Sequence, residues 1–121
     1  LSGWNVSKAV DISWMFHGAT KFNSDLSRWD VGNAEKMKFM FAETEEFNSD
    51  LSNWKVDRVE KFDGMFSKTK QFNCDLRRWN IESFSFVKGM FYRAESFEVE
   101  NIDTWNSEIK TSKLFENPRN E

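Results

Sequence analysis

The amino-acid sequence predicts a repeat solenoid of the α/β class, built from about five coils of roughly 25 residues each. Tryptophans recur at a constant interval at Trp4, Trp29, Trp54 and Trp79, and Trp105 follows one residue late. Two phenylalanine series, which begin at Phe16 and Phe22, keep the same period. A fixed period of roughly 20 to 50 residues is typical of solenoids, in which each repeat buries its apolar face against its neighbours. The period therefore predicts an elongated scaffold.

The first part of each coil predicts a short strand. The regular coils follow the frame L-x-x-W-x-[VI]-x-x-[AVF], as in Leu51, Trp54, Val56 and Val59. Trp54 and Val56 are two residues apart, which places both side chains on one face of an extended chain. We expect strands at about 3–6, 28–31, 53–56 and 78–81. Because every coil runs the same way and returns through its own helix, these strands would form a short parallel sheet with right-handed connections.

The second part of each coil predicts a short helix on the opposite side. Met37, Met40 and Phe41 are spaced i, i+3 and i+4, which aligns them on one face of a helix. The charged residues in the rest of that turn, among them Glu35 and Glu60, would face outward. Phe47 would then return to the core. The Asn-Ser-Asp segment after it is typical of a turn, because these side chains bond nearby backbone groups.

The repeats divide the chain into two parts. Residues 1–101 hold four regular repeats, and residues 102–121 hold a divergent fifth repeat, which we expect to act as a C-terminal cap. Terminal repeats are usually atypical because one of their faces meets water. Leu1 opens directly in the frame of a normal coil, so we expect a fragment of a longer solenoid. The Leu1 end would then stack on further repeats or on another subunit.

Composition and motifs argue against several classes of function. The chain has 17 Lys and Arg and 20 Asp and Glu without a basic run or stripe, which argues against nucleic-acid binding. No stretch approaches about 18 consecutive apolar residues, so we expect no membrane span. His17, the only histidine, has no partners at metal-ligand spacing, and no catalytic triad or Gly-rich phosphate loop is recognisable. We therefore expect no enzyme activity, no metal and no cofactor.

An aspartate column leaves two interpretations open. Asp25, Asp50 and Asp75 occupy one position in successive coils. Carboxylates about 5 Å apart would repel each other by roughly 3 kcal/mol, so the column must be neutralised or splayed. Each Asp can accept N–H bonds within its own turn, or the column can hold cations such as Ca²⁺. The neighbouring asparagines can equally form a structural ladder.

Two residues depart from the repeat pattern. Cys74 replaces the serine of the first two coils, and we expect a buried or turn-lining thiol. The tryptophans of the frame are in phase with its apolar residues, which places them in the core rather than on a sugar-binding surface. Trp14 lies outside the frame, aligns with Phe39, Gly64 and Gly89, and is expected to be partly exposed.

The residues that alternate with Trp and Val supply the candidate partner-binding surface. Their side chains would point away from the core and line up from coil to coil. They vary within a constant frame, as a binding face does and as an unconstrained surface also does. The eight candidates are Arg28, Asp30, Asn53, Lys55, Asp57, Arg78, Asn80 and Glu82. We expect a partner to bind this concave strand face, with the helical face as the alternative.

The repeat resembles that of a known family. The segments FNSDLSRWDVGNAEKMKFMFAET and FNSDLSNWKVDRVEKFDGMFSKT are similar to the repeat of BspA-like leucine-rich repeat surface proteins, also described as the DUF285 or PARCEL repeat. The resemblance covers residues 1–97, with Lys55 and Asn80 where the family favours Asp. It implies a leucine-rich-repeat-like right-handed coil, a cell-surface or extracellular location, and protein binding or adhesion rather than chemistry.

The expected function is therefore non-enzymatic protein–protein binding as part of a surface or secreted protein. One alternative is a structural subunit docked permanently in a larger multi-protein assembly. Another is carbohydrate or calcium binding along the stack.

Overall fold

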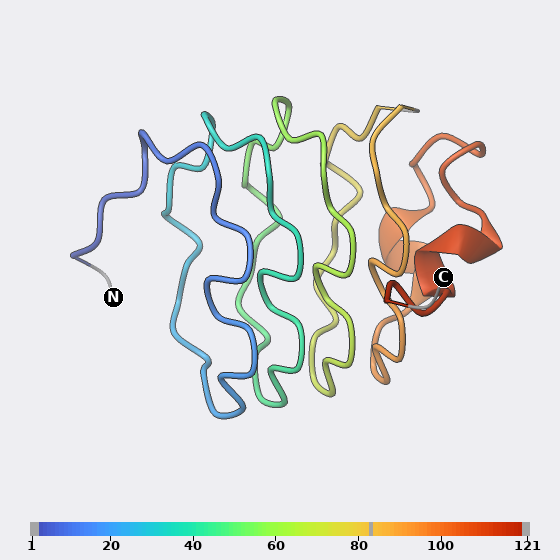
Figure 1. Ribbon diagram of the computed structural model, residues 1–121, viewed down its shortest axis with the longest axis horizontal. Coiled ribbons are helices and arrows are strands. Elements are labelled where there is room, and N and C mark those ends of the chain that lie inside the picture. Colours follow the sequence, from blue (N-terminus) through green and yellow to red (C-terminus); the bar gives the residue numbers. More distant parts are fainter. Residues whose placement is uncertain (1–2, 83, 120–121) are drawn as a thin grey trace.

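The computed structural model describes residues 3–82 and 84–119. The chain winds through successive coils that lie side by side in sequence order, from the blue end of the stack to the red end (Figure 1). We refer to residues 3–25, 26–50, 51–75 and 76–101 as coils one to four.

Backbone hydrogen bonds join each coil to the next through alternate residues. In coil two, the N–H groups of Met37, Phe39, Phe41 and Glu43 donate to carbonyl oxygens of coil three over 2.8 to 2.9 Å. In each case the acceptor directly precedes the residue of coil three that is equivalent to the donor. Coil one bonds to coil two, and coil three to coil four, through the equivalent residues. We call this part of each coil the ladder; it spans residues 12–18, 37–43, 62–68 and 87–93.

The expected α/β class, a leucine-rich-repeat-like coil with a sheet and short helices, is wrong. The regular elements of the described residues are two short 3₁₀ helices, η1 (Val99–Ile102) and η2 (Ser112–Phe115). Successive coils share isolated parallel bridges that do not extend into strands. These bridges pair Asp11 with Lys36, Lys36 with Lys61, and Lys61 with Phe86.

The expected strands at 3–6, 28–31, 53–56 and 78–81 do not form, and in coil three a turn lies at each end of the segment. In coil three, the Trp54 N–H donates to the Leu51 carbonyl at 3.1 Å, and the Val59 N–H donates to the Val56 carbonyl at 3.0 Å. These N–H groups are bonded within their own coil, so they are not available for a sheet. Trp54 and Val56 are nevertheless both buried, as the period-2 pattern required.

The expected helices are replaced by turns as well. The Met40 N–H donates to the Met37 carbonyl, and the Thr44 N–H donates to the Phe41 carbonyl. The third residue of each of these turns has a positive φ, which an L-residue does not adopt within a right-handed helix. Positive φ recurs at the same two places in each ladder, at Trp14, Gly18, Phe39, Glu43, Gly64, Lys68, Gly89 and Arg93.

Aromatic rings stack from coil to coil in the core. Phe41 lies between Phe16 and Phe66, with ring centroids 5.6 and 5.7 Å away. Phe47 stacks on Phe41 within the same coil, at 4.2 Å. Burial of each such ring contributes about 1.5–3 kcal/mol. The ring columns therefore hold the coils together alongside the ladder bonds.

Asparagine side chains also link successive coils. The Asn23 side-chain oxygen accepts the backbone N–H of Asn48 at 2.8 Å. The Asn48 side-chain oxygen in turn accepts the backbone N–H of Asn73 at 2.9 Å. The Asn73 oxygen accepts the N–H of Glu98 at 2.9 Å. The structural asparagine ladder that the sequence allows is therefore present.

The end of the described chain folds onto coil four. The Gly89 N–H donates to the Lys113 carbonyl at 2.8 Å, and the Phe91 N–H donates to the Leu114 carbonyl at 2.9 Å. Lys113 and Leu114, in η2, thus take the place of a further ladder. That residues 102–121 cap the stack stays a prediction, and the expectation about Leu1 falls outside the described residues.

Candidate functional site

All eight candidate residues are exposed, but no sheet forms among the described residues, so they do not share a concave strand face. Five of them line three separate hollows. Arg28 and Asp30 line the first, Arg78 the second, and Asp57 and Glu82 the third. The structure therefore does not bring the candidates together in one site.

In each of the first two hollows, a candidate residue already bonds to a neighbour that does not line the hollow. The Arg78 guanidinium donates to the side-chain oxygen of Asn53, one coil away, at 2.7 Å. Asp30 accepts the N–H of Gly32 at 3.0 Å. These contacts fix the side chains within the repeat. They do not require a ligand.

The aspartate column is bonded within its own turns. Asp25, Asp50 and Asp75 each accept the backbone N–H of the residue two positions on, at 2.9 to 3.0 Å. Hydrogen bonds from Arg77 lower the pKa of Asp75 to about 2, and bonds from Ser52 lower the pKa of Asp50. In the described part of the chain, no three or more His, Cys, Asp or Glu side chains are arranged to hold a metal ion.

Cys74 occupies the buried serine position of the repeat. Its sulfur accepts the N–H of Leu51 at 3.3 Å, where Ser49 accepts the N–H of Leu26 at 3.0 Å. Burial raises the pKa of the thiol to about 11, so it stays protonated at neutral pH. The expected buried thiol is confirmed, and its role is to accept a backbone hydrogen bond.

The third hollow differs from the other two, because four carboxylates line it together with an exposed aromatic ring. This acidic groove has a volume of about 430 Å³ and is lined by Glu35, Asp57, Arg58, Val59, Glu60, Glu82 and Phe84. Phe84 is 69% exposed, whereas Ala34 and Val59, at the same position of coils two and three, are 1% and 4% exposed. Four carboxylates and one exposed ring thus border the same groove.

The sequence pattern missed most of this groove. The repeat frame assigns Phe84 to the core, because the equivalent positions hold Ala34 and Val59. The increase in size from Ala to Val to Phe was the available signal that the third side chain would not fit. Glu35 and Glu60 were assigned to the outer face of a helix, which the described residues do not form.

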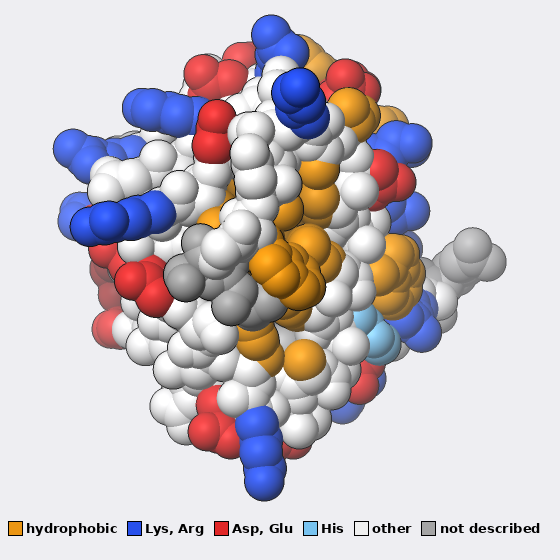
Figure 2. Space-filling view, turned by 90° about the vertical axis from the view of Figure 1, so that its left-hand side faces the viewer, with side chains coloured by type: hydrophobic (Ala, Val, Ile, Leu, Met, Phe, Trp, Pro, Cys, Tyr) orange, Lys and Arg blue, Asp and Glu red, His pale blue; other side chains and the backbone are white. Residues whose placement is uncertain are grey.

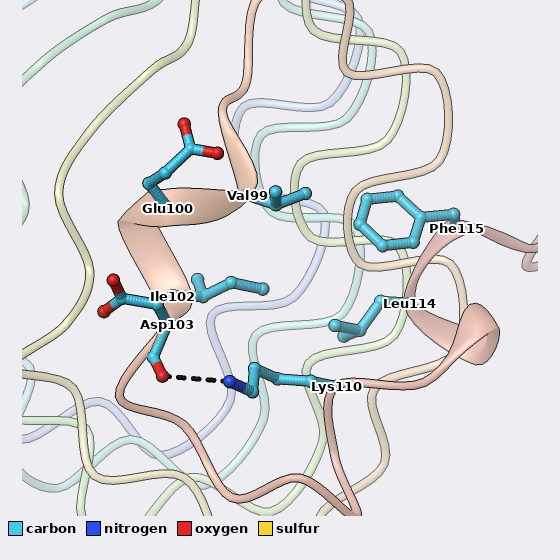
Figure 3. A pocket seen from close by; sticks show the side chains of 7 residues that line it. All are labelled: Val99, Glu100, Ile102, Asp103, Lys110, Leu114 and Phe115. Atoms are coloured by element: carbon cyan, nitrogen blue, oxygen red, sulfur yellow. Dashed lines mark hydrogen bonds between the residues drawn. The ribbon is translucent and has the colours of Figure 1, made fainter.

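A smaller pocket lies between η1 and η2. It measures about 300 Å³, and Figure 3 shows the apolar side chains of both helices facing it. The Lys110 ammonium donates to the Asp103 carbonyl at 2.9 Å at the edge of this pocket. It is lined by Val99, Glu100, Ile102, Asp103, Lys110, Leu114 and Phe115.

The coil-one end of the stack also has an apolar surface. Hydrophobic side chains gather near the centre of this end, with charged side chains around them (Figure 2). The exposed large apolar residues of coil one are Trp4, Val10 and Trp14. The frame tryptophans Trp29 and Trp54 are buried, as expected, whereas the expectation is wrong for the frame tryptophan Trp4, which is 53% exposed. Among the described residues, no helix is both long and apolar enough to cross a membrane.

Tandem coils of nearly constant length, joined by ladders and bearing exposed hollows, define a repeat protein. The chain belongs to the family described as Mycoplasma protein of unknown function, DUF285, whose model matches residues 1–105. The DUF285 part of the resemblance noted in the sequence is confirmed. Searches of curated proteins and of solved structures gave no match.

Proposed function

We propose that the protein is a non-enzymatic module, belonging to a surface or secreted protein of the BspA-like type, that binds a partner protein. The partner contributes a basic segment, which lies in the acidic groove that coils two, three and four line. The single observation that carries this proposal is the exposed Phe84 ring beside four carboxylates.

The carboxylates of the groove and its exposed ring both indicate the chemistry of the partner. Glu35, Glu60 and Glu82 face the groove together with Asp57, so Lys and Arg side chains are favoured there. Arg58, the cation that lines the groove, donates to the Asn33 side-chain oxygen at 2.9 Å. An exposed aromatic ring is a typical anchor of a protein interface, and it requires an apolar side chain on the partner.

Selection from a library of displayed random dodecapeptides tests this function. We expect the enriched peptides to combine Lys or Arg with one large apolar residue. Phe84→Ser and Glu82→Lys should each weaken the binding of these peptides at least about 10-fold. Lys55→Ala is the matched control, because Lys55 is exposed and does not line the groove. Equal binding by the natural chain and the Phe84→Ser variant would refute the proposal.

A second candidate function is a structural subunit docked permanently in a larger assembly. The hydrophobic side chains at the coil-one end favour it (Figure 2). Light scattering and thermal melting of the isolated chain distinguish the two functions. A folded monomer supports the free-standing binding module, whereas dimerisation or aggregation supports the docked subunit.

A further inference from the structure

A short segment after η2 packs across the ladder turns. We call residues 116–119 the strap. An added Cβ at Gly89 would come within 2.5 Å of the Glu116 carbonyl oxygen and of Pro118 Cδ. The strap therefore fills space that is open only because position 89 is a glycine with a positive φ of 66°.

The equivalent positions of the other coils extend this row. An added Cβ at Gly64 would overlap the ring of Phe39, so that ring covers the backbone of the next coil. The Trp14 ring stacks on Phe39, with centroids 4.3 Å apart and planes 16° apart. Trp14 is 42% exposed. Trp14 and Phe39 thus form one stacked aromatic pair, which we call the platform; Phe39 itself is only 7% exposed.

The strap places a cation on this platform. The Arg119 guanidinium carbon lies 5.0 Å from the centre of the Trp14 ring and 5.2 Å from that of Phe39. Both distances are within the range of a cation–π interaction. Glu43 and Lys68 line the same hollow as Phe39 and the strap.

The conformation of the strap is set by local contacts. The Arg119 N–H donates to the Asn117 side-chain oxygen at 3.0 Å, and the Glu116 N–H donates to the Lys113 carbonyl of η2 at 3.3 Å. The first bond would persist if the strap left the platform, because donor and acceptor move together.

We propose that the platform is a binding site for a Pro-Arg segment of another protein, and that the strap occupies this site in cis. The chemistry of the ligand follows from the internal occupant, since Pro118 covers Gly89 while Arg119 covers both rings. A partner must displace the strap, so its apparent affinity falls by the fraction of molecules in which the platform is open. This site is separate from the acidic groove and does not depend on it.

The test uses the ¹⁵N-labelled Arg119→Ala chain and the peptide acetyl-Glu-Asn-Pro-Arg-amide. Peptide binding should shift the indole N–H signal of Trp14, with an apparent Kd at least about 10-fold lower than for the natural chain. Two controls are matched to this arrangement. Acetyl-Glu-Asn-Pro-Ala-amide should not bind. The Arg93→Ala chain removes an arginine that packs on Tyr92 instead, at 5.2 Å, and should behave as the natural chain does.

Two results would overturn the proposal. One is an unchanged Trp14 signal in the Arg119→Ala chain, and the other is equal affinity after adding Trp14→Ala. If the Arg119→Ala chain does not fold, titration of the natural chain with the peptide tests the proposal instead. Excess peptide should then move the side-chain N–H signal of Arg119 to its position in an unfolded chain, and an unmoved signal would show that the strap is only part of the fold.

Discussion

The indole N–H of Trp54 donates a 2.9 Å hydrogen bond to the carbonyl oxygen of Leu26, in the preceding coil. The same bond joins Trp79 to Leu51 and Trp105 to Leu76, each at 2.9 Å. The third donor is one position further from its acceptor than the first two are, which matches the extra residue before Trp105. Each of these tryptophans therefore fills the core and also gives a second hydrogen bond to a backbone carbonyl of the preceding coil.

Replacing Trp54 by alanine should be severely destabilising. The cavity alone costs about 3–5 kcal/mol, and the Leu26 carbonyl loses one of its two partners, keeping the Trp29 N–H. Lys55→Ala, one residue away but exposed, should change the free energy of unfolding by less than about 0.5 kcal/mol. Urea unfolding followed by tryptophan fluorescence measures both. If the two variants unfold alike, the assignment of buried and exposed positions is wrong.

Alanine substitutions at three glycines distinguish the stability cost of a positive φ from the cost of steric overlap. Gly18→Ala, at a φ of 76° with open space around it, should cost about 1–2 kcal/mol. Gly64→Ala should cost a further 1–3 kcal/mol or so, because its Cβ overlaps the Phe39 ring. Gly3→Ala, with neither constraint, is the control. Chemical denaturation of the three variants gives the comparison, and equal losses at Gly18 and Gly64 would mean that Phe39 moves aside freely.

Cys74 offers a test of the buried hydrogen bond to Leu51. Cys74→Ser should stay within about 1 kcal/mol of the natural chain, because Ser49 already makes this bond in the preceding coil. Cys74→Val should cost about 1–3 kcal/mol, since it leaves the Leu51 N–H buried without an acceptor. Thermal unfolding of both variants is the measurement. A valine variant as stable as the serine variant would show that this bond contributes little.

Acid should destabilise the protein in part through Asp75. Its pKa falls from 3.8 to about 2 on folding, because Arg77 hydrogen-bonds its ionised form. A lowered folded-state pKa means that the stabilisation is present above pH ~4 and is lost as the pH falls toward ~2. Asp75→Asn should therefore lose less stability over this range than the natural chain. Unfolding midpoints of both chains between pH 2 and 6 check this, and parallel curves would contradict it.

The repeat period and the buried residues could be predicted from the sequence, but the local conformation could not. Met37 and Met40 are buried as expected, yet a turn closed between residues i and i+3 has the same spacing as one helical turn. The positive φ at Phe39 explains why the chain turns there instead. The only sign of this positive φ in the sequence was that glycines, Gly64 and Gly89, occupy the equivalent position in coils three and four.

The candidate site was predictable only as a set of exposed residues. Asp57 and Glu82 do line the acidic groove, because side chains that alternate with the core positions point outward. Their grouping depends on the turns, which the period does not specify. Phe84 was assigned to the core because the repeat frame does not take the available volume into account. The binding role of all eight candidates stays a prediction.

The peptide dipoles of the ladder also point in one common direction. In a β-sheet the peptide groups of a strand alternate in direction, and their dipoles nearly cancel. Here the carbonyls of Lys36 and Lys38 both point back to coil one, while the N–H groups of Met37 and Phe39 both point on to coil three. Four peptide groups in each regular ladder point in this direction. Between successive coils, two to four backbone bonds beside the ladder run the other way. Since each peptide carries a dipole of about 3.5 D, the ladder peptides are polarised along the axis of the stack, with their negative ends toward coil one, and the opposed bonds reduce the sum.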